Sequence, residues 1–378
     1  MKIAFIPSTF LPWVGGAEIQ THNTANKLVE LGNDVDILLL NNENIKNRKY
    51  NIIKLNKFLI NIVYLAKYYL NVDLGFLLKI YFKKVCSNKN YKAWHFHSVN
   101  FKTLLYVKPL KELGQNIIIT FQGADIQKDK NILYGYRFDQ KYENLLIKSL
   151  KLIDKVYAIS DDVKNELISL NFTKSKIVKI PNSIEVKKFL EFDVIRKKDD
   201  TINFITVARY YEKKKGLDLI ESVSKKLIEK KINFKWTLVG RDSKNLLEKD
   251  FILKNKNYFN IENEISNYDE IYFPHSRLIK MYKLNDAYIN LARIESFGIT
   301  IIEAIAAGLP VISFNTKGAN ELVVNDENGV LIEDYNPDKM AEVIILKIKE
   351  KYFNKKINYE KIEKFDLTYN SKLTQDNY

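Results

Sequence analysis

Two carboxylates eight residues apart form the pair in this sequence that is best placed to do chemistry. Glu295 lies in a predicted loop before Gly298, and Glu303 lies in a predicted helix over residues 299–307, among isoleucines and alanines. Eight helical residues rise about 12 Å, so the two carboxylates could hold two parts of one long ligand. Because the neighbours of Glu303 are apolar, we expect its carboxylate to be buried and to need a protein donor or ligand hydroxyls. An exposed glutamate on a helix with one wet face is the alternative.

Two cations in the same half of the chain form a second candidate group. Arg209 follows a predicted strand over residues 203–208, and Lys215 comes six positions later, across a loop. Open α/β sheets bind ligands at the carboxyl ends of their strands. There the planar fork of Arg209 and the point charge of Lys215 could hold a diphosphate, and Lys214 could take the role of Lys215. A solvated basic loop is the alternative.

A glycine pair marks a third candidate position. Gly15 and Gly16 separate a predicted strand over residues 2–7 from a predicted helix that ends at Gly32. In this strand, turn and helix order, typical of a doubly wound sheet, their amides could approach a pyrophosphate at the helix N-terminus. An ordinary tight loop is the alternative. The full Gly-x-Gly-x-x-Gly fingerprint is missing, which counts against a dehydrogenase.

The carboxylate segment resembles a known signature. The segment reads Glu-x7-Glu, with Ser296, Phe297 and Gly298 after the first glutamate and Ala-x-Ala-x-Gly-x-Pro-Val after the second glutamate. It is similar to the donor-site signature of retaining glycosyltransferases of family 4. The resemblance covers nearly the whole chain, densely from residue 204 to residue 332. It implies an α/β fold of the GT-B type, with two Rossmann-like domains facing across a cleft. It also implies transfer of a sugar from a UDP- or GDP-sugar, with retention at the anomeric carbon.

The resemblance also assigns roles to the candidate residues. Arg209 and Lys215 would neutralise the leaving diphosphate, assisted by the amides of the glycine pair. Glu303 would bind ribose hydroxyls, and Glu295 would bind hydroxyls of the transferred sugar. Residues 296–298 would shape a helix N-terminus against phosphate. Because the cations do the electrostatic work, the family implies no metal and no cofactor besides the donor.

One loop of the first half departs from the family pattern. Thr120-Phe-Gln-Gly-Ala-Asp125 resembles the family's Thr-Phe-His-Gly-x-Asp loop, whose histidine lies at the reaction centre. Gln122 occupies the histidine position. An amide can hydrogen-bond a sugar hydroxyl but cannot take a proton. We therefore include Gln122 among the predicted catalytic residues, as a hydrogen-bonding group.

Two further pairs could suggest a metal. His95 and His97 share a face of a predicted strand, but no third ligand lies nearby. Asp34 and Asp36 form the Asp-x-Asp pattern of metal-dependent GT-A transferases, yet they enter a strand directly after a helix end. We expect neither pair to bind a metal.

Length and composition bound the domain organisation and the partners. The 378 residues suffice for two domains, and the single cysteine, Cys86, excludes an intrachain disulfide. The net charge of +14 favours a phosphate-bearing partner, which we expect to be a diphosphate substrate and not nucleic acid. We predict an acceptor-side domain at 1–185, a linker at 186–201, a nucleotide-sugar domain at 202–350 and a helical tail at 351–378. The family implies that the tail crosses back to the first domain.

Residues 54–84 combine lysines with an aromatic, amphipathic helical pattern. This pattern is typical of a helix that binds a membrane surface, so an anionic membrane is a candidate partner. A helix packed on the sheet is the alternative. Without a run of about 18 apolar residues we expect no transmembrane helix. We expect a cytoplasmic protein, peripheral on the inner face of the plasma membrane. Its acceptor would be a lipid-linked or polysaccharide glycan in bacterial surface polysaccharide synthesis.

Two other functions remain open at this point. A nucleotide-sugar 2-epimerase shares the two-domain fold, but as a rule lacks this arginine, lysine and double-glutamate set. A non-enzymatic basic protein would bind membrane or nucleic acid. Acceptor-dependent release of nucleotide from a donor sugar distinguishes a transferase from both.

Overall fold

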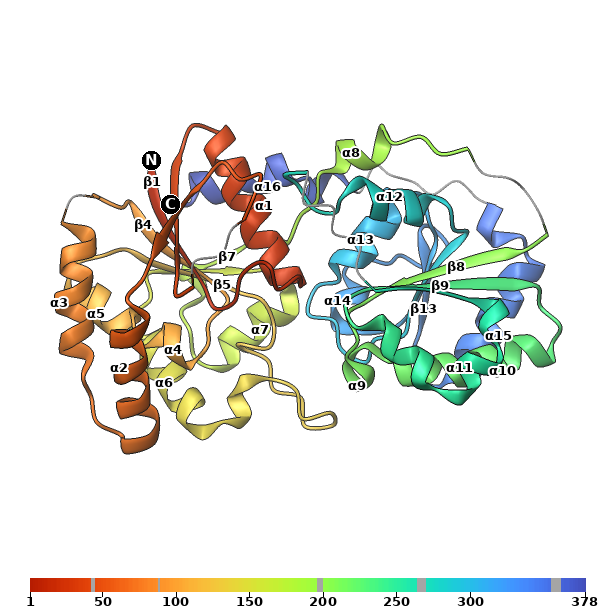
Figure 1. The fold of residues 1–378 in the computed structure, drawn as a ribbon, viewed down its shortest axis with the longest axis horizontal. Coiled ribbons are helices and arrows are strands. Elements are labelled where there is room, and N and C mark those ends of the chain that lie inside the picture. The colour runs from red at the N-terminus through yellow and green to blue at the C-terminus, as the bar shows by residue number, and fades with distance from the viewer. Residues whose placement is uncertain (42–44, 88, 196–199, 264–269, 355–361) are drawn as a thin grey trace. The chain divides into compact units, whose positions relative to one another are not determined.

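The computed structural model describes residues 1–41, 45–87, 89–195, 200–263, 270–354 and 362–378. Its contacts divide the chain into two compact units, Met1–Asn182 together with Leu367–Tyr378, and Ser183–Asp366. In Figure 1 each unit is a twisted sheet with helices on its two sides. The predicted pair of Rossmann-like domains is thereby confirmed.

The first unit contains a parallel sheet of seven strands in the order β3-β2-β1-β4-β5-β6-β7. The central strands are continuous apolar runs because helices cover both faces of the sheet. The strand order reverses between β1 and β4, which is where doubly wound sheets bind ligands. The strands are β1 Lys2–Pro7, β2 Asp34–Leu39, β3 Asn51–Lys54, β4 Ala93–His97, β5 Ile117–Phe121, β6 Lys155–Ala158 and β7 Ile177–Lys179.

The helices of the first unit come from both ends of the described chain. Helix α16 (Leu367–Asp376) packs on α1 (Gly16–Glu30), and the Asn33 amide donates to Gln375 Oε1 at 3.0 Å. The phenol of Tyr378 reaches the sheet and lies 2.7 Å from His95 Nδ1. The other helices are α2 Lys57–Leu70, α3 Gly75–Cys86, α4 Phe101–Leu104, α5 Val107–Glu112, α6 Gln140–Leu150 and α7 Asp161–Ser169.

The second unit contains a parallel sheet of six strands in the order β10-β9-β8-β11-β12-β13. Its core is a cluster of buried residues around Trp236 and Phe204. The strands are β8 Ile202–Val207, β9 Phe234–Val239, β10 Phe259–Glu262, β11 Ala287–Asn290, β12 Val311–Phe314 and β13 Gly329–Ile332. The helices are α8 Val186–Leu190, α9 Glu212–Lys215, α10 Ile220–Glu229, α11 Asp250–Lys254, α12 Ser276–Lys283, α13 Ile299–Ala306, α14 Lys317–Asn320 and α15 Pro337–Lys349.

The domain boundaries differ from the expected ones. The division falls after Asn182, and the start of the expected linker at 186–201 is helix α8, which belongs to the second unit. The reason is that Val186 and Phe189, three positions apart, bury their side chains there. Residues 351–366 also stay with the second unit, whereas 367–378 join the first. Positions 196–199 of the expected linker lie outside the described residues.

None of the helices in the described ranges is long and apolar enough to span a bilayer.

Candidate functional site

The loop that carries Arg209 leaves the carboxyl end of β8, as predicted. Gly240, at the end of β9, permits this path, because a Cβ there would lie 2.0 Å from the carbonyl oxygen of Ala208. The carbonyl of Arg241 accepts a hydrogen bond of 2.8 Å from the N–H of Tyr210, which ties the two loops together. The Arg209 side chain is exposed, and its guanidinium has no hydrogen-bond partner within the described residues. It is therefore available to an anionic ligand.

Lys215 ends the short helix α9 and faces Glu295. Gly216, with φ +65°, takes the left-handed conformation that turns the chain there, and a Cβ would lie 1.9 Å from the carbonyl oxygen of Leu291. This close approach brings α9 against the segment that follows β11. The Lys215 ammonium forms an ion pair with Glu295 Oε1. Two residues separated by 80 positions in the sequence thus meet.

Lys214 belongs to the same group of charges. The pKa of Lys214 is lowered to about 8, chiefly by burial; the Glu295 carboxylate opposes this effect and the Arg209 charge adds to it. Lys214 therefore lies within electrostatic range of both residues. Three cations surround one carboxylate here, which leaves the group with an excess of positive charge suited to a diphosphate.

A salt bridge holds the two segments of this site together. The Arg293 guanidinium donates to both oxygens of Asp218, at 2.7 and 2.6 Å, and to the carbonyl of Lys213 at 2.8 Å. The backbone N–H of Arg293 also donates to the carbonyl of Lys214 at 2.9 Å. Bidentate pairs of this kind fix geometry as well as charge. Arg293 and Asp218 thus position α9 relative to Glu295.

The residues after Glu295 form a tightly packed turn into α13. The N–H of Gly318 donates to the Glu295 carbonyl at 2.9 Å, and a Cβ on Gly318 would lie 2.8 Å from the nitrogen of Phe297. Ser296 and Phe297 are buried, and Gly298, with φ +102°, precedes the first residue of α13. The predicted turn and helix are confirmed, and the turn places Glu295 beside Lys215.

Glu303 is buried, as predicted, with only 3% of its surface exposed. The hydroxyl of Tyr282 donates to Glu303 Oε2 at 2.8 Å and is its protein donor. Burial raises the pKa of Glu303 to about 7, although the tyrosine hydrogen bond lowers it somewhat. Burial also raises the pKa of Tyr288, and the charges of Glu295 and Glu303 add to the rise. Tyr288 therefore lies within electrostatic range of both carboxylates.

Gln122, Gly15 and Gly16 lie in the first unit. Gly15 caps α1 and Gly16 is its first residue, as predicted. The Gln122 side chain exchanges two hydrogen bonds, of 3.0 and 3.3 Å, with the Asn182 amide. The Asp125 carboxylate accepts from the N–H of Gln122 at 3.0 Å and fixes the loop, and burial raises its pKa to about 6.

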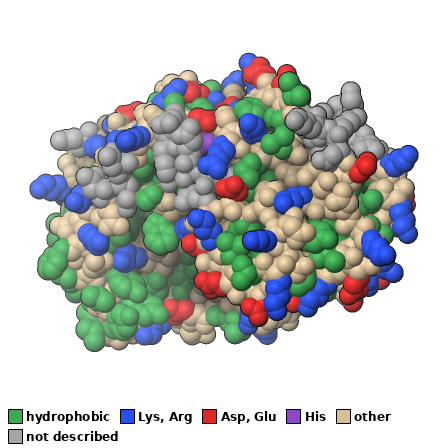
Figure 2. Space-filling model, turned by 45° about the vertical axis from the view of Figure 1, so that its right-hand side comes forward, with side chains coloured by type: hydrophobic (Ala, Val, Ile, Leu, Met, Phe, Trp, Pro, Cys, Tyr) green, Lys and Arg blue, Asp and Glu red, His purple; other side chains and the backbone are tan. Residues whose placement is uncertain are grey.

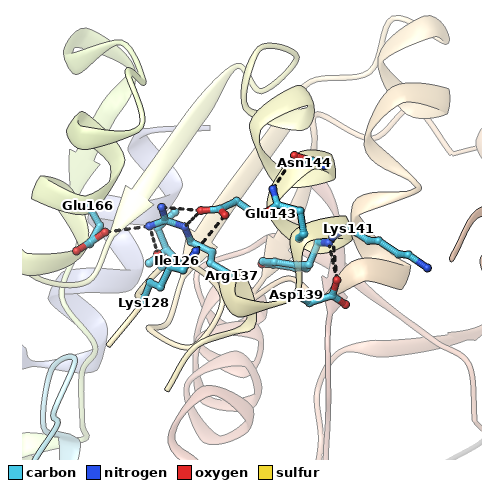
Figure 3. A network of polar contacts seen from close by, with 10 residues as sticks. Ile126, Lys128, Arg137, Asp139, Lys141, Glu143, Asn144 and Glu166 are labelled. Carbon is cyan, nitrogen blue, oxygen red and sulfur yellow. Dashed lines mark hydrogen bonds and ion pairs between the residues drawn. The ribbon is translucent and has the colours of Figure 1, made fainter. Parts of the chain in front are cut away.

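A buried arginine holds the segment that follows this loop. Figure 3 shows the Arg137 guanidinium between Glu143 of α6 and Glu166 of α7, each at 3.0 Å. The same guanidinium donates to the carbonyl of Ile126 at 2.9 Å, and Lys128 approaches Glu143 to 3.1 Å. This network ties the chain after Asp125 to two helices and so supports the position of Gln122.

One member of each candidate metal pair, Asp36 and His95, has structural hydrogen-bond partners, whereas the ring nitrogens of His97 are buried without one among the described residues. Asp36 accepts from Tyr91, Lys89 and Asn51. His95 lies 2.7 Å from both Thr120 Oγ1 and the Tyr378 hydroxyl. In the part of the chain that the structure describes, no group of three His, Cys, Asp or Glu side chains could hold a metal ion.

Sequence reasoning did not identify Tyr282, Tyr288 or the pair of Arg293 and Asp218. Tyr282 precedes Glu303 by 21 positions, and Asp218 precedes Arg293 by 75. Contacts over such separations leave no local pattern. The sequence offered one signal for such a contact. Because Glu303 was expected to be buried, its carboxylate needed a hydrogen-bond donor, but the sequence did not show which residue provides it.

Comparisons with known proteins show which families the chain matches. The family described as Glycosyltransferase Family 4 matches residues 14–188, and the family described as Glycosyl transferases group 1 matches residues 187–364. An uncharacterized glycosyltransferase of Methanocaldococcus jannaschii is 24% identical over 376 residues, which cover 96% of this chain and 95% of the relative. The N-acetyl-alpha-D-glucosaminyl L-malate synthase of Bacillus anthracis is 23% identical over 352 residues, which cover 90% and 87%.

Solved structures establish the fold. A glycosyltransferase from Rickettsia africae superposes with a TM-score of 0.71 at 22% identity, covering 99% of this chain and 97% of its own. Anabaena HepE in complex with UDP and glucose gives a TM-score of 0.74 at 14% identity, covering 100% and 98%. Together the two family models span residues 14–364. The chain thus belongs to the group 1 glycosyltransferases and is a transferase with the GT-B fold.

Proposed function

We propose that this glycosyltransferase transfers a sugar from a UDP- or GDP-sugar with retention at the anomeric carbon and without a metal. The observation that carries the proposal is the charged group of Arg209, Lys214, Lys215 and Glu295 at the carboxyl ends of β8 and β11. Such strand ends bind ligands in open α/β sheets. The solved complex of Anabaena HepE with UDP-glucose adds support for a nucleotide sugar donor.

Each residue has a defined part in this proposal. Arg209 and the lysines bind the diphosphate and stabilise its charge as the sugar leaves, which is the work that a metal does elsewhere. Glu303, eight residues from Glu295, accepts hydrogen bonds from ribose hydroxyls in exchange for the one from Tyr282. Retention follows from attack on the face that the diphosphate leaves, with Gln122 as a hydrogen-bonding group.

The ion pair of Lys215 and Glu295 suggests how the two side chains are held before the donor binds. Each side chain neutralises the other while no donor is bound, since an unpaired half-buried charge is costly. On donor binding, Lys215 exchanges the carboxylate for a phosphate oxygen, and Glu295 becomes free to accept hydrogen bonds from sugar hydroxyls. Both residues would then bind parts of one donor.

The test is acceptor-dependent release of UDP or GDP from a panel of nucleotide sugars. We expect Lys215→Ala to lower kcat/KM about 100-fold or more, because a charge-assisted contact to the leaving group is lost. Lys213→Ala is the matched control, since Lys213 is an exposed lysine of the same helix and should leave the rate within about twofold. An unchanged rate in Lys215→Ala would contradict the proposed role of the group.

Two further readouts test the finer parts of this function. Activity should persist in excess chelator, and NMR should find the same anomeric configuration in donor and product. Loss of activity in chelator would refute metal independence, and an inverted product would refute retention. Interconversion of free nucleotide sugars without an acceptor would instead indicate the epimerase.

We also place the protein on the inner face of the plasma membrane, with a lipid-linked or polysaccharide glycan as acceptor. The support comes from an α2–α3 apolar surface, defined by exposed side chains of α2, α3 and the loop between them. The first four of these residues on α2 recur four, three and four positions apart and form a helical stripe opposite the buried Ile60 and Val63. Figure 2 shows hydrophobic side chains gathered at the lower left of the view, where Figure 1 has α2. The members are Phe58, Ile62, Leu65, Tyr69, Leu70, Val72, Phe76 and Ile80.

The charges around this surface suit an anionic bilayer. Residues 54–84 contain six lysines and one acid, Asp73. Phe58 and Ile80 are 76% and 66% exposed, which is costly in water unless a partner covers them. An apolar face flanked by lysines is the chemistry of a helix that lies in the headgroup region of a membrane.

A further inference from the structure

A cavity of about 200 Å³ lies within the first unit, beside the point where its strand order reverses. It opens at the carboxyl ends of β1 and β2, next to the loop that follows β4. Its wall is mixed: besides aliphatic residues it includes the aromatic residues Phe10, Trp13 and Tyr106 and the polar residues Ser8, Thr9, Asn41 and Asn100. Aromatic faces with interspersed hydrogen-bonding groups suit a sugar ring, which is apolar on its faces and polar at its edge.

One member of the wall has an unused hydrogen-bonding group. The Tyr106 side chain is 1% exposed, and its hydroxyl is buried with no hydrogen-bond partner within the described residues. A buried hydroxyl without a partner costs free energy, so such groups commonly belong to sites that a ligand or water completes.

One lysine lines this cavity, and a second bonds to a residue of its wall. Lys102 lines it and donates to Asn61 of α2 at 2.8 Å, while Lys57, at the start of α2, donates to the lining residue Asn41 at 3.0 Å. Both partners are neutral amides, and no ion pair of either lysine occurs among the described residues. The two ammonium groups lie close enough to repel each other, because Lys57 adds to the lowering of the Lys102 pKa that burial causes. Two neighbouring cations held by amides form a site for a phosphate.

We propose that this cavity is the acceptor site and that it takes a glycosyl phosphate or diphosphate. The sugar ring occupies the cavity against Tyr106, and the phosphate bridges Lys57 and Lys102. Phe58 follows Lys57 directly and begins the α2–α3 apolar surface, so a lipid attached to the phosphate would continue along that surface. The inference rests on the proposed transferase function and adds the chemical class of the acceptor.

Binding tests the site independently of transfer. Calorimetric titration of the donor-free protein would use glucose 1-phosphate in solution and a polyprenyl diphosphate-linked hexose in nanodiscs. We expect saturable binding of at least one probe, weakened about tenfold or more by Lys102→Gln and by Lys57→Gln, and largely retained by Lys102→Arg. Binding of the soluble probe identifies a free sugar phosphate as sufficient, whereas binding of the nanodisc probe alone identifies a lipid-borne acceptor. Either result supports the site.

A lysine far from the cavity in the sequence provides the control for the binding experiment. Lys148→Gln removes an exposed lysine of α6, in the same unit, and should leave binding unchanged. Absence of saturable binding by both probes, or an equal loss in Lys148→Gln, would overturn the inference. Transfer assays distinguish the failure of this acceptor site from the failure of the proposed function. Suppose that Lys215→Ala abolishes transfer, whereas Lys57→Gln and Lys102→Gln leave KM unchanged for both phosphate-bearing acceptors. The transferase function would then be supported and this acceptor site would be refuted.

Discussion

Glu303 shows how one side chain can couple ligand binding to stability. Its carboxylate is buried against Tyr282, and burial raises its pKa from 4.5 to about 7. The folded protein therefore binds more protons than the unfolded chain between about pH 4.5 and 7. The free energy of unfolding falls as the pH rises through this window, and the full cost is present above it. The role proposed for Glu303 in binding donor hydroxyls would therefore come with a cost in the stability of the ligand-free protein above pH 7.

We predict that Glu303→Gln raises the melting temperature of the ligand-free protein at pH 8 and has little effect at pH 4.5. The amide can accept the Tyr282 hydrogen bond without a buried charge, and the gain at pH 8 is at most on the order of 3 kcal/mol. Thermal melting at the two pH values measures the difference. Glu229→Gln, on the exposed side of α10, is the control. An equal change at both pH values would show that the charge of Glu303 is not the cause.

At the residue scale, the sequence predicted candidate site residues but not the side chains that these residues contact. Glu295, Glu303 and Lys215 were identified from residue type and spacing. Spacing could not reveal that Lys215 pairs with Glu295, because the chain between them has to fold first. The same holds for Gln122, whose amide is paired with Asn182.

At the scale of elements, the α2–α3 apolar surface carries a prediction about membranes. We expect the protein to float with vesicles containing phosphatidylglycerol at low salt, and to be released at high salt because the lysines are then screened. Phe58→Ser with Leu65→Ser should abolish most of this binding. Loss of Lys83 and Lys84 together should weaken it roughly 30-fold, at about 1 kcal/mol for each lysine.

The matched control for this experiment lies in the other unit. Leu253 of α11 is also exposed, and Leu253→Ser should leave flotation unchanged. Failure to float at low salt, or equal binding to neutral phosphatidylcholine, would argue against an anionic membrane as the partner.

Elements were more predictable than their boundaries. Six-residue strands that are mostly apolar, such as β1 and β8, are visible in the sequence because both faces are largely buried. Helix α8 was missed because its five residues include only one helical turn of apolar side chains, and charged residues flank it on both sides. The helical pattern of α2 was recognised, but the sequence alone could not tell which of its two apolar faces is buried.

At the scale of the whole molecule, the return of residues 367–378 to the first unit should matter for its stability. Removing them would uncover the face of α1 that α16 covers and the groups that Tyr378 contacts. We predict a loss of about 3 kcal/mol, which lowers the melting temperature of the first unit by roughly 6–12 °C. Tyr378→Phe, which removes only the hydroxyl at His95, should cost about 1 kcal/mol. Circular dichroism melting curves measure both, and unchanged melting after truncation would refute the prediction.

The same arrangement has a consequence for biosynthesis. The ribosome completes residues 1–182 early, but α16 emerges only after the entire second unit has been made. The nascent first unit must therefore wait with the α16-binding side of α1 uncovered, while the second unit can fold as soon as residue 366 leaves the exit tunnel. A chaperone that binds nascent chains would find its substrate in that interval.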